Sequence, residues 1–197
     1  MNIAKLKTIR KLYFGYEEIA RTLAIRPGSA RVFANRYVNQ GLLVRLKRNI
    51  YVMRERWDGL TQEELFCLAN VAQVPSYVSL MTALGYYDIT TQIQRGFVES
   101  IAVKRTKEII IDDTVFNYVK INRNLYGGFI KKENFFIAVP EKALLDALYL
   151  KFLRRYSFDL SSIDVSKINK KKLYKMAKKY PRKVIKLLRG DGYIRKA

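Results

Sequence analysis

The chain has 197 residues and carries 38 lysines and arginines against 17 aspartates and glutamates, a formal net charge of +21 at pH 7. It has no histidine and a single cysteine, Cys67, which excludes Ser-His-Asp and Cys-His catalysis, histidine-ligated zinc and an intramolecular disulfide. No apolar run approaches the ~20 residues of a membrane span, and no apolar signal core opens the sequence. We therefore expect a cytoplasmic protein with no membrane partner.

The positive charge is concentrated at the two ends of the chain. Residues 1–56 carry 13 basic and 3 acidic side chains, residues 57–169 carry 13 of each, and residues 170–197 carry 12 basic and 1 acidic. Two basic ends around a neutral middle indicate surfaces that bind phosphate. Neither end offers the exposed Trp and Phe of a lipid-seeking helix, so nucleic acid is the expected partner.

Residues 1–56 contain three helical patterns followed by two strand-like runs. Apolar spacing and turn residues place these elements, in order, at 3–13, 16–25, 26–41, 42–46 and 50–53. Proline and glycine open the third helix, a glycine follows it, and a cationic turn joins the two strands. This order predicts a winged helix-turn-helix over residues 1–56.

The third predicted helix has an apolar stripe and a polar face. The stripe consists of Ala30, Phe33, Ala34 and Tyr37. The opposite face would enter the major groove of double-stranded DNA, because a helix has the width that this groove accepts. Candidate contacts on this face are Ser29, Arg31, Asn35, Arg36 and Gln40.

The hairpin after this helix is the predicted wing. It would lie on phosphate or in the minor groove and fix register rather than sequence. Its candidate contacts are Arg45, Lys47, Arg48 and Asn49. A charged hairpin tip can also be only a solvated turn that blocks unwanted strand pairing. The basic helix that precedes it favours the DNA-binding interpretation.

Residues 57–197 are predicted to form the second domain. A capping-box pair, Thr61 and Glu64, begins a helix at 62–72 after a linker. The patterns that follow predict a helix at 77–89, strands at 97–104, 107–112, 116–121 and 135–139, a helix from Pro140, and two lysine-rich helices divided at Pro181. The expected fold class is α+β: the winged helix-turn-helix, then a mixed α/β domain with a small antiparallel sheet and C-terminal helices. Candidates for extra phosphate contacts are Lys171, Lys172, Lys175 and Lys179.

Two other function classes stay open from the residues alone. A carboxylate set for Mg²⁺ and nuclease chemistry is offered by Glu99, Glu108, Asp112 and Asp113. Adjacent residues of a strand face opposite sides, however, unless a turn intervenes. The basic ends would also suit an RNA-binding protein that acts on tRNA or the ribosome. We favour a DNA-binding protein with no metal, no cofactor and no catalytic activity of its own.

Two strings behind the predicted winged helix carry a family resemblance. They are "YVSLMTALGYYDIT" at 77–90 and "FFIAVPEKALLDALY" at 135–149. Their most specific parts are Tyr77 to Leu80 with Ala83 and Leu84, and Pro140 to Asp146. In this order the chain, over about residues 5–150, resembles the AbiEi family of antitoxins and transcriptional regulators from bacterial type IV toxin-antitoxin systems. The lysine-rich end matches no motif of that family.

The resemblance implies a function for each domain. The first would bind inverted repeats in its own promoter and repress the operon. The second would act as antitoxin against a co-encoded nucleotidyltransferase toxin, without a stable antitoxin-toxin complex, in a system linked to abortive phage infection. For Glu141 to Asp146 the residues themselves predict a structural role, in which the string caps and packs a helix and its charged members face a partner.

Overall fold

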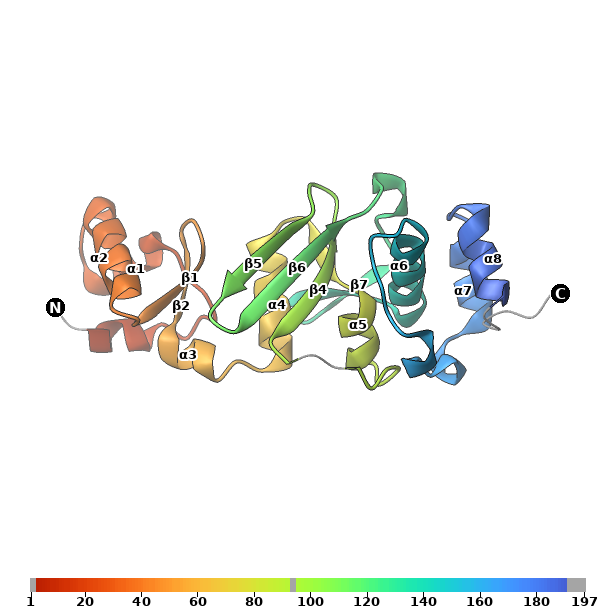
Figure 1. Cartoon of the computed structure of the whole chain (residues 1–197). Helices are drawn as coiled ribbons and strands as arrows, with labels where there is room; N and C mark the ends of the chain where they lie inside the picture. The colour runs from red at the N-terminus through yellow and green to blue at the C-terminus, as the bar shows by residue number, and fades with distance from the viewer. Residues whose placement is uncertain (1–2, 93–94, 191–197) are drawn as a thin grey trace. The chain divides into compact units, whose positions relative to one another are not determined.

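The computed structural model describes residues 3–92 and 95–190, and the chain divides into two units (Figure 1). The first unit is Met1–Leu68 and the second is Ala69–Ala197. The division therefore falls within a helix, whereas the sequence-based boundary lies after residue 56. Each unit buries a core of its own.

The first unit contains three helical segments and a hairpin in the predicted order. Its elements are η1 (Ile3–Thr8), α1 (Tyr16–Leu23), α2 (Pro27–Asn39), β1 (Leu43–Lys47), β2 (Ile50–Met53), α3 (Arg54–Asp58) and the start of α4 (Gln62–Ala72). The first segment is a short 3-10 helix rather than a helix over 3–13, because the chain must turn to bring Phe14 beside Tyr51, with which it forms an antiparallel bridge. The predicted linker contains the helix α3.

The core of the first unit holds α2 against α1 and the hairpin. The predicted stripe of α2 is buried, and Phe33 and Tyr37 stack with ring centroids 4.1 Å apart. Other buried members of this core are Leu6, Phe14, Ile19, Ala20, Leu43 and Tyr51. Burial of one side of α2 leaves its other side exposed.

Asn49 fixes the turn of the hairpin to the start of α1. Its φ of 59° lies in the left-handed region, which asparagine tolerates better than most residues. Its Oδ1 accepts a hydrogen bond from the Tyr16 backbone N–H at 2.7 Å, and its Nδ2 donates to the Glu17 carboxylate. A Cβ at position 15 would lie 2.6 Å from the Glu17 carboxylate and 3.1 Å from two Asn49 oxygens, so glycine suits this close approach. The hydrogen bond from Asn49 lowers the pKa of Glu17.

The second unit is built on a six-stranded sheet. After α4 come β3 (Ser76–Val78), α5 (Leu80–Tyr86), β4 (Phe97–Ala102), β5 (Lys107–Ile111), β6 (Thr114–Lys120), η2 (Arg123–Leu125), β7 (Phe129–Lys132), β8 (Phe135–Ala138), α6 (Pro140–Phe152), η3 (Leu160–Ser162), η4 (Val165–Lys167), α7 (Lys170–Ala177) and α8 (Arg182–Gly190). The strand order is β5-β6-β4-β3-β8-β7, and the β4-β6 and β3-β8 pairs are parallel. Helix α5 packs on β4, and α6 contacts α5, α7 and α8 (Figure 1).

The sheet of this unit is six-stranded and mixed, so the prediction of a small antiparallel sheet was wrong: two strands were missed, and the predicted strands β4 and β6 pair in parallel. Residues 77 and 78 were assigned to a helix, yet Val78 pairs with both Ser100 and Ile137 and so lies inside the sheet. The other missed strand, β7, is a four-residue edge strand. Pairing partners this far apart in the sequence leave no local signal. The strands at 97–104, 107–112, 116–121 and 135–139, the helix from Pro140 and the two lysine-rich helices are confirmed.

Candidate functional site

One face of α2 is polar, exposed and free of core contacts. At about 100° per residue, Val32, Asn35 and Asn39 form the line opposite the buried stripe, and Arg31 and Arg36 lie on its two sides. All five are exposed, Val32 by 62%. Val32 was not among the predicted contacts because it is apolar. Its position outside the apolar stripe nevertheless indicated that its side chain would be exposed.

The remaining predicted contacts of this helix lie nearer its buried side. Ser29 and Gln40 are both exposed. At the same helical angle they fall beside Phe33 of the core rather than on the outermost line. They therefore border the polar face rather than occupy its centre.

The arginines of α2, of the residue before it and of the hairpin have no acidic partner in the part of the chain that the structure describes. These side chains, which form no hydrogen bond or ion pair with the described residues, are Arg26, Arg31, Arg36, Arg45 and Arg48. We call them the arginine set. Carboxylates of the same unit bind other cations: Glu18 pairs with Lys11, Glu55 with Lys7 and Glu64 with Arg56. The positive charge of the arginine set is thus left without neutralisation inside the described residues.

The four predicted wing residues divide into two kinds. Arg45 and Arg48 are exposed, whereas Lys47 is partly buried and is engaged within the protein. Asn49 is occupied by Tyr16 and Glu17. Its role in the structure is to hold the turn, so we leave it out of the interface proposed below.

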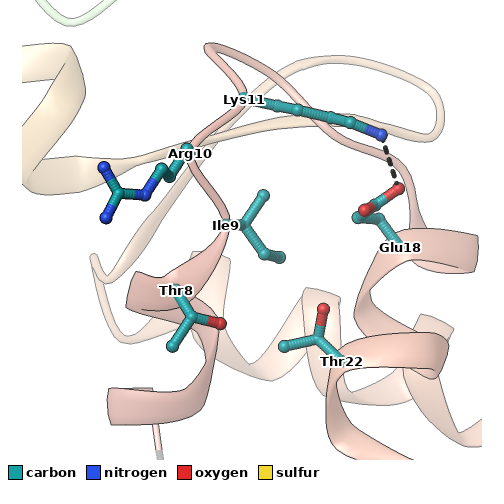
Figure 2. A pocket seen from close by; sticks show the side chains of 6 residues that line it. All are labelled: Thr8, Ile9, Arg10, Lys11, Glu18 and Thr22. Atoms are coloured by element: carbon teal, nitrogen blue, oxygen red, sulfur yellow. Dashed lines mark hydrogen bonds and ion pairs between the residues drawn. The ribbon is translucent and has the colours of Figure 1, made fainter.

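An open pocket of about 400 Å³ lies between the end of η1 and α1 (Figure 2). Its lining side chains are those of Thr8, Ile9, Arg10, Lys11, Glu18 and Thr22. Lys11 closes an ion pair with Glu18 at 2.9 Å, and the Arg10 guanidinium points away from that pair (Figure 2). The hydrogen bond from Lys11 lowers the pKa of Glu18. Because its two facing charges satisfy each other, we assign this pocket no ligand.

The carboxylates considered for Mg²⁺ do not converge. Glu99 is buried on β4, where it accepts hydrogen bonds from two backbone N–H groups at the start of α5 and from the Tyr156 hydroxyl at 2.7 Å. Burial raises the pKa of Glu99, although these hydrogen bonds act to lower it. Glu108 is exposed on β5, and Asp112 and Asp113 form the turn that follows. Among the described residues, no three acidic, cysteine or histidine side chains are grouped to hold a metal ion.

The two strings that carry the family resemblance meet in the core of the second unit. Asp146 of α6 is 0% exposed and binds four side chains. Its Oδ2 accepts hydrogen bonds from the hydroxyls of Tyr77 and Ser79, both at 2.9 Å. Its Oδ1 binds the Lys142 ammonium and the Tyr180 hydroxyl. We call these five residues the Asp146 network.

Burial dominates the electrostatics of this network. It lowers the pKa of Lys142 and raises the pKa of Asp146. It also raises the pKa values of Tyr77 and Tyr180, so both phenols stay protonated and act as donors. Lys142 and Asp146 are four residues apart on one helix, a spacing that brings their side chains together. The network therefore joins β3, α6 and the segment after α7 through one fully buried carboxylate.

The charged residues of the string from 141 to 146 do not face a partner. Their exposed fractions are 4% for Glu141, 2% for Lys142 and 0% for Asp146, so that part of the prediction was wrong. Glu141 instead binds Lys172 at 2.9 Å. Lys172, predicted as a phosphate contact, is therefore engaged within its own unit, whereas Lys171, Lys175 and Lys179 are exposed.

No family model matches the chain, and no curated protein matches it. Within residues 3–92 and 95–190, no helix combines the length and apolar character needed to cross a bilayer. The two groups of residues that bear on function are therefore the arginine set and the Asp146 network.

Proposed function

We propose that the first unit is a winged helix-turn-helix that binds double-stranded DNA, and that the chain is a sequence-specific repressor of its own operon. The observation that carries this proposal is the arginine set, five exposed guanidinium groups on α2, on the residue that precedes it and on the hairpin, without an acidic partner in the described chain. Arginine presents a planar fork of donors that matches phosphate and guanine edges. A surface of this kind favours a polyanion.

The connection between α1 and α2 supports the same proposal. Three residues, Ala24 to Arg26, separate the two helices, the turn length of a helix-turn-helix. Ala24 lies in the left-handed region with φ 54°, which reverses the chain over this short distance. The hairpin follows α2 directly, as a wing would. In this arrangement α2 is the recognition helix.

We assign different roles to the two parts of the interface. Arg31 and Arg36 would read guanine through bidentate hydrogen bonds, and Asn35 would read adenine. Arg45 and Arg48 of the hairpin would contact phosphate and set the register.

The family resemblance extends the proposal to the second unit. We propose that it acts as antitoxin against a nucleotidyltransferase encoded beside it, without forming a stable complex. Support comes from the Asp146 network, because four of its five residues belong to the two strings of the resemblance. Co-expression of that nucleotidyltransferase tests the proposal: the chain should restore growth, and continued arrest would contradict it.

Replacing Arg45 and Arg48 together with alanine should weaken binding to every DNA sequence by a similar factor. Loss of two phosphate contacts should also make the slope of log affinity against log salt concentration shallower by about 2. Fluorescence anisotropy over a salt series measures both effects. Arg56→Ala, which removes an arginine already paired with Glu64, serves as the control. An unchanged slope in the double variant would show that the hairpin does not touch phosphate.

Val32 should contribute recognition of thymine. An exposed apolar side chain at the centre of the α2 polar face fits the thymine methyl group, the apolar feature of the major groove. Replacing thymine by uracil in the bound duplex should therefore weaken binding by the intact chain, and should have little further effect on Val32→Ala. Equal losses for both proteins would assign the thymine contact to another residue.

A further inference from the structure

A second pocket, of about 260 Å³, lies entirely within the second unit. It forms where η2 and the glycine pair before β7 meet α6 and the segment after α7. Leu125, Tyr126 and Met176 supply apolar walls, and the Tyr126 ring contacts Tyr77 of the Asp146 network at a centroid distance of 5.1 Å. Burial raises the pKa of Tyr126 to about 12, so this wall is uncharged. The volume suits a ligand smaller than a typical drug.

Two lysines and two glycine N–H groups supply hydrogen-bond donors to this pocket, beside Asn124 and two tyrosine hydroxyls, which can both donate and accept. Lys142 has three ammonium N–H groups, and only Asp146 and Tyr180 accept from them among the described residues. Lys179 is exposed and has no ion-pair partner in that part of the chain. The backbone N–H groups of the neighbouring glycines, 127 and 128, likewise donate to no described acceptor.

The charge balance of the pocket is positive. Two ammonium groups, Lys142 and Lys179, stand against one carboxylate, Asp146, which is fully buried and already bound by four donors. Gly128 allows the backbone to lie against Met176 and Lys142, since a Cβ at this position would lie 2.6 Å from the Met176 Cε and 3.2 Å from the Lys142 side chain. Its φ of +76° also suits glycine.

We propose that this pocket binds a small organic anion: a flat ring that carries one phosphate or carboxylate group. The ring packs against Tyr126 and Met176, and the anionic group accepts hydrogen bonds from Lys179, the free N–H of Lys142 and the glycine backbone. This site lies in the second unit alone, so it does not depend on DNA binding by the first.

Titration calorimetry on the full chain tests the proposal with four probes. Uridine monophosphate and salicylate carry both a ring and an anionic group, whereas uridine lacks the anion and inorganic phosphate lacks the ring. We expect at least one of the first two to bind roughly tenfold more tightly than uridine and inorganic phosphate. Binding of uridine monophosphate alone would identify the phosphate form, and binding of salicylate alone the carboxylate form. No binding by either, or equal binding of inorganic phosphate, would overturn the proposal.

A matched pair of lysine variants locates the bound probe. Lys179→Gln should weaken its affinity about tenfold, the effect of one charge-assisted hydrogen bond, while Lys170→Gln, exposed on α7 outside the pocket, should not. In amide NMR spectra, the probe should shift the Gly127 and Gly128 resonances. Equal losses in the two variants, with no shift of these glycines, would show general attraction to a basic protein and overturn the site.

Discussion

Asp146→Ala is expected to destabilise the second unit by roughly 3–5 kcal/mol, the largest stability effect we predict for a single substitution. The change removes the counter-ion of the buried Lys142 ammonium and leaves the hydroxyls of Tyr77 and Ser79 without their acceptor. A charge or donor left unpaired in a protein interior incurs the full desolvation cost. Denaturant unfolding followed by circular dichroism measures the loss.

The control for this substitution is Glu108→Ala in the same unit. Glu108 is an exposed carboxylate on β5, so its removal should change the free energy of unfolding by no more than about 0.5 kcal/mol. Changing Lys142 to methionine together with Asp146→Ala should recover part of the loss, because no buried charge then remains. If Asp146→Ala unfolded at the same denaturant concentration as the unaltered chain, Asp146 would not be the centre of the second unit's polar core.

Arg31→Ala combined with Arg36→Ala is expected to remove most of the preference for one DNA sequence while leaving weak, general binding. A bidentate contact between arginine and guanine contributes ~1–3 kcal/mol of discrimination, and the two arginines lie on opposite sides of the outward line of α2. Affinities for a preferred and a shuffled duplex at one salt concentration measure the change. The two values should approach each other in the double variant.

Arg21→Ala is the matched control for that experiment. Arg21 is an exposed arginine of α1 whose guanidinium lies 3.8 Å from the Glu18 carboxylate. Its removal should leave the ratio of the two affinities unchanged. A double variant that kept the full preference of the intact chain would assign base recognition to residues other than Arg31 and Arg36.

Local patterns predicted the elements of the first unit well. The stripe of Ala30, Phe33, Ala34 and Tyr37 is buried as expected, because helical periodicity depends only on neighbouring residues. The occupation of Asn49 by Tyr16 and Glu17 could not be predicted, since these residues are more than 30 positions away. Which cations remain unpaired is likewise a property of the folded unit.

Long-range pairing explains what the sequence did not show in the second unit. Tyr77 and Asp146 are 69 residues apart, and Tyr180 lies 34 residues beyond Asp146, at the end of a predicted lysine-rich helix. A signal for the network was nevertheless present. Lys142 and Asp146 stand four residues apart in a helix of almost continuous apolar character, and charges so placed are seldom buried unless paired.

The claim that α2 and the hairpin read DNA is tested most directly by the affinity of the intact chain for three nucleic acids at one salt concentration. These are a duplex from immediately upstream of its own gene, a shuffled duplex of equal length and composition, and a structured RNA. We predict that the upstream duplex binds at least about 10³-fold more tightly than the shuffled duplex, the lower end for specific DNA-binding proteins, and that the RNA binds no better than the shuffled duplex. Similar affinity for all three would contradict the account and show a general polyanion-binding surface.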